Sequence, residues 1–126
     1  MLKAKQLGGQ MSYSYMLVRL KEQIGNFKEF HEENVIALDT DLEDIKSIIY
    51  KIVPNIEWSQ QDECTIFGSI PCRLSSTLPS NVEVWVIGNP VCALTISGIE
   101  ENELISIGNL LKMTIVDVQT GEVVGR

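Results

Sequence analysis

The stretch VEVWVIGNPVCALTISG, residues 82–98, constrains the fold more than any other part of the chain. Residues 82–87 and 91–97 are rich in β-branched side chains, and the Gly-Asn-Pro between them predicts a hairpin. Both runs are apolar on both faces over much of their length, which is typical of central strands. We therefore expect helices on one face of the sheet and further chain over part of the other.

Two segments have the periodicity of amphipathic helices. In residues 40–54 (TDLEDIKSIIYKIVP), apolar side chains recur at steps of three and four. Thr40 is the predicted N-cap, Glu43 would complete a capping box, and Pro54 would end the helix. Residues 100–113 (EENELISIGNLLKM) predict a second helix, inside which Gly108 is either a mild penalty or a close-packing point against the sheet.

Further β-rich runs occupy residues 13–20 and 114–118, and two short strands joined by a polar turn at 60–63 follow the first helix. The expected fold is α+β, with an antiparallel or mixed sheet of about five to six strands and two helices on one face, in a ferredoxin-like arrangement. Residues 11–126 are expected to form a single domain. Residues 1–10 (MLKAKQLGGQ) are expected to be a flexible extension or a cloning remnant.

The chain is acidic, with a formal net charge of −7 and 44% apolar residues. The apolar content predicts a globular protein. Negative charge repels phosphate backbones and anionic lipids, so neither nucleic acid nor a membrane is an expected partner. The charge fits either a basic protein partner or an ordinary solubility device.

Residue types that carry catalysis or bind metals are sparse. Cys64, Cys72 and Cys92 lack paired short spacings, His31 stands alone, and no phosphate-loop motif occurs. We therefore expect no catalytic residue, metal or cofactor. No stretch resembles a signal peptide or a membrane span, so the expected location is cytoplasmic.

Acidic clusters and one tryptophan are the candidate partner-binding residues. They are Asp39, Asp41, Glu43, Asp44, Asp62, Glu63, Trp85, Glu100, Glu101 and Glu103. Two of the clusters precede predicted helices, where carboxylates favour the positive end of the helix dipole without any partner. Trp85 alternates with Val84 and Val86, so it is either a core residue or an exposed anchor on the opposite face.

The closing segment LLKMTIVDVQTGEVV, residues 110–124, predicts a strand, a turn and a second short strand. Gly121 can supply the positive φ of the turn, while Asp117 and Gln119 would stabilise it. The segment resembles the Asp-x-Gln-x-Gly ending of a loose group of small bacterial proteins, and MSYSYMLVRL, residues 11–20, is similar to their opening strand. Val118 departs from the proline that the group often has there. Some members are similar to immunity proteins, which neutralise a cognate toxin.

These features predict a non-enzymatic protein-binding domain, an immunity-type inhibitor that blocks a basic toxin through its acidic surface. A small-ligand-binding domain or an enzyme of unknown reaction is the alternative, and would require Asp117 and Gln119 to line a deep pocket with another ionisable group. A structural homodimer, joined through a sheet edge or an uncovered face, is a further alternative.

Overall fold

A computed structural model describes residues 14–73 and 80–125 of the chain. The expected extension at residues 1–10 lies outside these ranges. The elements in chain order are β2 (Ser14–Leu20), η1 (Phe27–Glu29), η2 (Glu32–Asn34), β3 (Val35–Ile36), α1 (Leu42–Ile52), β4 (Glu57–Asp62), β5 (Thr65–Arg73), β6 (Ser80–Gly88), β7 (Val91–Ser97), α2 (Glu101–Leu111), β8 (Thr114–Asp117) and β9 (Val123–Gly125).

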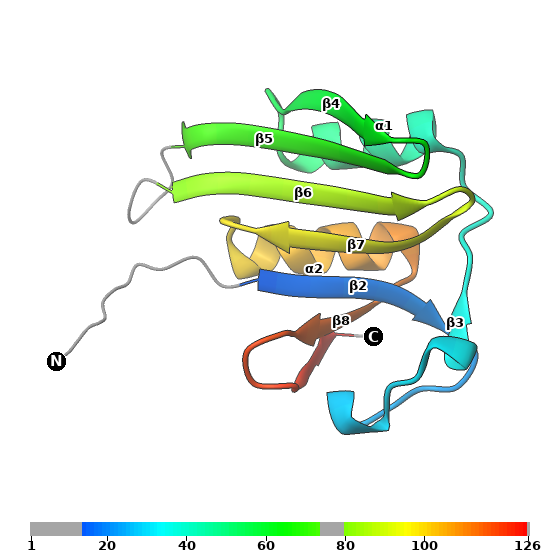
Figure 1. Ribbon diagram of the computed structural model, residues 1–126. Coiled ribbons are helices and arrows are strands. Elements are labelled where there is room, and N and C mark those ends of the chain that lie inside the picture. The colour runs from blue at the N-terminus through cyan, green and yellow to red at the C-terminus, as the bar shows by residue number, and fades with distance from the viewer. Residues whose placement is uncertain (1–13, 74–79, 126) are drawn as a thin grey trace, which may run out of the picture.

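The expected α+β class is confirmed. In the described part of the chain, the strands form one antiparallel sheet in the order β4-β5-β6-β7-β2-β8-β9, with β3 paired to β2. Helices α1 and α2 lie side by side behind the sheet in Figure 1, on the same face. None of the described helices is long and apolar enough to cross a bilayer.

The sheet has eight described strands, so the expectation of about five to six was too low. Strand β3 was not expected, because its 2 residues are too few for a period-two pattern, whereas β9, which has 3 residues, is the second short strand expected after the closing turn. The expected turn at residues 60–63 was also misplaced. Strand β4 continues to Asp62, because an edge strand tolerates polar side chains, and the turn is formed by Glu63 and Cys64.

The helix ends show one corrected cap and one unpredicted capping box. At α1 the N-cap is Asp41 and not Thr40, since the Asp41 carboxylate accepts a hydrogen bond from the Asp44 backbone N–H at 2.9 Å. At α2, Glu100 and Glu103 form a capping box. Carboxylates in both first turns also meet the positive end of each helix dipole.

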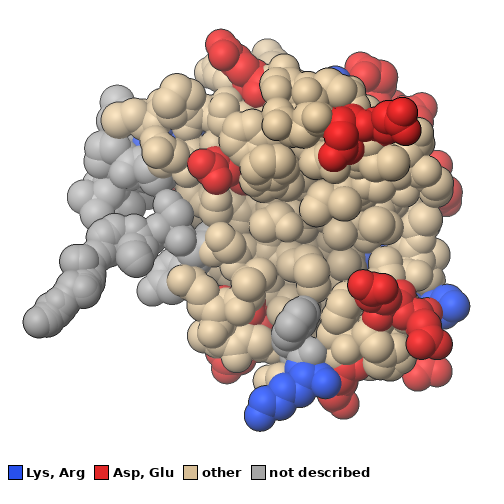
Figure 2. Space-filling view, viewed as in Figure 1, with Lys and Arg blue, Asp and Glu red and all other residues tan. Residues whose placement is uncertain are grey.

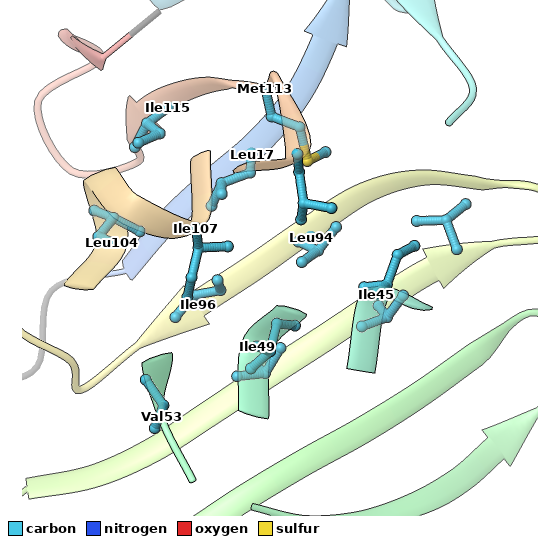
Figure 3. Close-up of a cluster of buried hydrophobic side chains, with 14 of the residues drawn as sticks. Leu17, Ile45, Ile49, Val53, Leu94, Ile96, Leu104, Ile107, Met113 and Ile115 are labelled. Carbon is cyan, nitrogen blue, oxygen red and sulfur yellow. The ribbon is translucent and has the colours of Figure 1, made fainter. Parts of the chain in front are cut away.

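The main core lies between the helices and the inner face of the sheet (Figure 3). Its largest fully buried side chains come from both layers, and include Leu17, Ile45, Ile49, Leu94, Ile96, Leu104, Ile107, Leu111 and Ile115. A Cβ added to Gly108 would lie 2.7 Å from Ile115 Cδ1, which confirms the close-packing alternative for this glycine. The absence of a side chain at Gly108 lets α2 approach β8 closely.

A second, smaller core lies on the outer face of the sheet over β2. Val18, Leu20 and Ile24 are buried there, with Phe30 and Val35 packed against them. The segment between β2 and β3 therefore covers one part of the outer face, as expected, but it lies over β2 and reaches only Ala93 of the hairpin from which the cover was predicted. The outer face of β4, β5, β6 and β7 contributes no residue to this second core except Ala93.

Candidate functional site

Two of the three acidic clusters meet at one end of the sheet. There the loop before α1, the β4–β5 turn and the β6–β7 hairpin surround a cleft of about 620 Å³, which we call the end cleft. In Figure 1 these three segments lie together at the right-hand end. The lining residues are Leu38, Asp39, Thr40, Asp41, Leu42, Gln60, Glu63, Cys64, Thr65, Ile66, Val86, Gly88, Asn89, Pro90 and Val91.

Negatively charged carboxylates and neutral polar side chains surround an apolar floor in the end cleft. Asp39, Asp41 and Glu63 are exposed, whereas Ile66 and Val86 are buried beneath them. Among the described residues that line the cleft, none is Lys or Arg. Such a lining suits a lysine or arginine side chain, whose methylene stem is apolar and whose head group is cationic.

Two of these carboxylates also have structural partners. Arg19 Nη1 donates a hydrogen bond to Asp39 Oδ1 at 3.2 Å, and this bond lowers the pKa of Asp39, so the carboxylate stays charged. The Asp41 carboxylate caps α1 through Oδ1, and Asp41 also lines the cleft. Among the described residues, no three acidic, His or Cys side chains are grouped closely enough to hold a metal ion.

The remaining members of these two clusters lie beside the end cleft without lining it. Glu43 and Asp44 are exposed in the first turn of α1. Asp62 Oδ1 accepts a hydrogen bond from the Cys64 N–H at 2.8 Å and so supports the β4–β5 turn. Their charges add to the negative potential at this end of the molecule.

The third acidic cluster lies at the opposite end of the sheet. Glu100, Glu101 and Glu103 begin α2, next to the end of β5. Glu103 binds the guanidinium of Arg73 through two hydrogen bonds of 2.7 and 2.5 Å, and its side chain is only 14% exposed. The structure therefore separates this cluster from the end cleft, and Glu103 has a local cation already.

Trp85 lies on the outer face of the sheet, where it is half-buried, while Val84 and Val86 are buried on the inner face. Its ring packs against Phe67 on the neighbouring strand, with centroids 4.4 Å apart. We call the outer surface of β4, β5, β6 and β7 the open face. Figure 2 shows the molecule from this side, with neutral side chains across the centre and acidic side chains mostly around the edge.

Sequence reasoning missed two further apolar residues of the open face. Phe67 is directly opposite Trp85 in the register, and Ile87, which is 37% exposed, follows two residues after Trp85. The alternation of β6 could have revealed Ile87, because residues two apart share a face. Phe67 required the pairing register of β5 with β6, which the sequence does not display.

The closing segment has the predicted turn. Asp117 Oδ1 accepts hydrogen bonds from the backbone N–H groups of Gln119 and Thr120, at 2.8 and 3.3 Å. Gly121 has a φ of +78°, so its predicted role as a backbone requirement is confirmed. Neither Asp117 nor Gln119 lines the end cleft.

Comparison with known proteins finds no match for this chain among protein-family models, curated proteins or solved structures.

Proposed function

We propose that this chain is a non-enzymatic protein-binding domain, an immunity-type inhibitor that neutralises a cognate basic toxin. The end cleft is the observation that carries the proposal. It combines three exposed carboxylates with an apolar floor, and its described lining contains no basic side chain. A lysine or arginine of a partner would place its cationic head group beside these carboxylates and its apolar stem against the floor of the cleft.

Inhibition would occur by steric blockade. A basic surface of the toxin would approach the acidic end of the sheet, and long-range attraction would raise the association rate. Residues seated in the end cleft would then hold the complex, because charged pairs that are desolvated in an interface slow dissociation. The resemblance of residues 11–20 and 110–124 to immunity-like proteins supports the same function, with the cytoplasm as the place of action.

We further propose that a ferredoxin-like core lies within the larger sheet. Strands β8, β2, β7 and β6 are adjacent in that order, and a helix follows both β2 and β7. This is the order expected of two split βαβ units, with β4 and β5 added beyond β6. The addition matters for function, because the β4–β5 turn supplies Glu63 to the end cleft.

The function can be tested with a charge-neutralised variant and a matched control. Asp41→Asn with Glu63→Gln removes two charges from the end cleft, and asparagine still caps a helix. Glu101→Gln with Glu122→Gln removes two charges from exposed positions elsewhere. Each immobilised chain would be incubated with a lysate of its native host at about 0.15 M salt, a physiological ionic strength.

We expect the wild type and the control to retain the same basic protein, and the cleft variant to retain about tenfold less, a difference of about 1.4 kcal/mol. That protein should stop bacterial growth when produced alone, and co-production of this chain should restore growth. The proposal is overturned if no protein is retained at physiological salt, or if the retained protein has no toxicity that this chain relieves.

A further inference from the structure

We propose that the open face is a second contact surface for a protein partner, and that it receives an aromatic or long aliphatic anchor residue flanked by Lys or Arg. The inference rests on the proposed function, because it concerns the same partner. It adds the surface from which most of the affinity would come and the chemistry of the segment that fits there.

The apolar centre of the open face is built by cross-strand pairing. Phe67, Trp85 and Thr95 are successive partners in the register of β5, β6 and β7, so their side chains form one row. Thr65, Ile87 and Ala93 form the next row towards the end cleft. Aromatic side chains such as Trp85 carry a large apolar area and form the hot spots of many interfaces.

The described part of the chain covers the neighbouring part of the outer face with its own residues, but it leaves Phe67 and Trp85 outside both cores. The segment between β2 and β3 packs on Val18 and Leu20, and neither Trp85 nor Phe67 belongs to that core or to the main one. The aromatic pair is therefore not accounted for by packing in either core. Its partly exposed rings would become buried if a partner docked there.

Charge decides which kind of partner fits. Glu57 on β4 and Glu83 on β6 are exposed and face outward. Among the described outward-facing residues of β4–β7 next to these two glutamates, none is Lys or Arg. Stacking of nucleic-acid bases on aromatic rings normally requires a basic groove. A second copy of this chain would bring like charges together. A segment with basic flanks would instead meet opposite charge.

The open face borders the end cleft, whose floor of Ile66 and Val86 belongs to the inner face. Thr65 lines the cleft and pairs with Ile87 in the register, while Gly88, directly after Ile87, also lines the cleft. One partner can therefore place a cation in the end cleft and an apolar anchor on the aromatic pair. This combination matches the usual division of an interface into an apolar centre and a charged rim.

The test uses a phage-displayed library of random 12-residue peptides selected on the full chain. Peptides with an aromatic or long aliphatic residue between Lys or Arg should be enriched. Trp85→Ala should weaken their binding about tenfold or more, as expected for an interface anchor. Thr95→Lys, a substitution at a half-buried position of the same row, should weaken it comparably by placing a cation on the face. Two independent variants guard against misfolding of either one.

Tyr50→Ala is the matched control, because Tyr50 is an aromatic residue on α1 that is 62% exposed. It should leave peptide binding within about twofold of wild type, since exposed residues outside an interface contribute little. Enrichment of acidic peptides, or binding unaffected by both open-face variants, would overturn the inference. So would a dimer in sedimentation that Thr95→Lys dissociates.

The same selection separates this inference from the proposed function. Peptides that lose binding to Asp41→Asn with Glu63→Gln but bind Trp85→Ala normally would support the end cleft and overturn the role of the open face. If basic peptides bind through Trp85 but the chain relieves no toxicity, the open face stands as a binding surface and the immunity function fails.

Discussion

Arg73 at the end of β5 donates two hydrogen bonds to the carboxylate of Glu103 in the first turn of α2, at 2.7 and 2.5 Å. The pair joins one end of the sheet to the start of the second helix. Glu103 also accepts a hydrogen bond from the Glu100 backbone N–H. A residue selected from the sequence as a candidate partner contact thus has a defined intramolecular role.

The ion pair predicts a pH-dependent loss of stability. Hydrogen bonds from Arg73, opposed in part by burial, lower the pKa of Glu103 from 4.5. A carboxyl whose pKa is lower in the folded state stabilises the fold above its unfolded pKa and stops doing so as the pH falls through the folded value. At pH 7, Glu103→Gln should cost about 1–2 kcal/mol in urea unfolding.

The difference between wild type and Glu103→Gln should shrink as the pH falls through 4.5, where half of the unfolded carboxyl is protonated, and on through the lower pKa of the folded state. Glu101→Gln, at an exposed position in the same turn, provides the control and should change the free energy of unfolding by less than about 0.5 kcal/mol. A cost for Glu103→Gln that stays constant down to low pH would contradict the ionic basis of this contact.

Asp41 and Thr40 can be distinguished as caps of α1 by two alanine substitutions. Asp41→Ala removes the acceptor of the Asp44 N–H and should reduce the free energy of unfolding by about 1 kcal/mol. Thr40→Ala should cost less than about half of that, because Thr40 lies outside the cap position. Chemical unfolding of both variants would check this, and equal costs would show that the two side chains share the cap.

Gly68 is expected to tolerate no side chain. Trp58 is its partner on β4, and a Cβ at Gly68 would lie 2.6 Å from Ile56 Cγ2 and 2.8 Å from the Trp58 ring. Gly68→Ala should destabilise the fold by about 1–3 kcal/mol, as overpacking does, and should perturb Trp58 fluorescence. Ser69→Ala on the other face of β5 is the control, and a neutral Gly68→Ala would show that the ring can move away.

Asn34 should hold the segment that covers the second core. Its side chain accepts a hydrogen bond from the Glu22 N–H at 2.9 Å and donates one to the Glu22 carbonyl at 2.8 Å, in a position that is 7% exposed. Asn34→Ala leaves both backbone groups without this partner and should cost about 1–3 kcal/mol.

Native-state hydrogen exchange would locate the effect of Asn34→Ala. Exchange should accelerate in residues 21–36 while α1 and α2 retain their protection, because the hydrogen bonds of Asn34 close this segment alone. Glu33→Ala, at an exposed neighbouring position, is the control. Uniform acceleration throughout the chain would show instead that the segment and the main core unfold as one unit.

Local patterns in the sequence determined the helices, the central hairpin and the closing turn. The spacing of apolar residues predicted α1 and α2, because recurrence at steps of three and four produces one apolar stripe along a helix. Each helix buries that stripe against the sheet. Alternation in β6 predicted that Trp85 lies on the other face of the sheet from Val84 and Val86, since successive strand residues point to opposite faces. Gly121 followed from the positive φ that a tight turn requires.

Tertiary structure alone decided which of these residues act together. Pairing between strands put Phe67 beside Trp85, and the antiparallel course of the chain placed Glu63 with Asp41 while it carried Glu103 to the far end with Arg73. Acidic clusters look alike in sequence, because dipole complementarity, ion pairing and partner binding all favour carboxylates. Only their placement in space, set by strand order and register, separates the cluster that contains Glu103 from the carboxylates that line the end cleft.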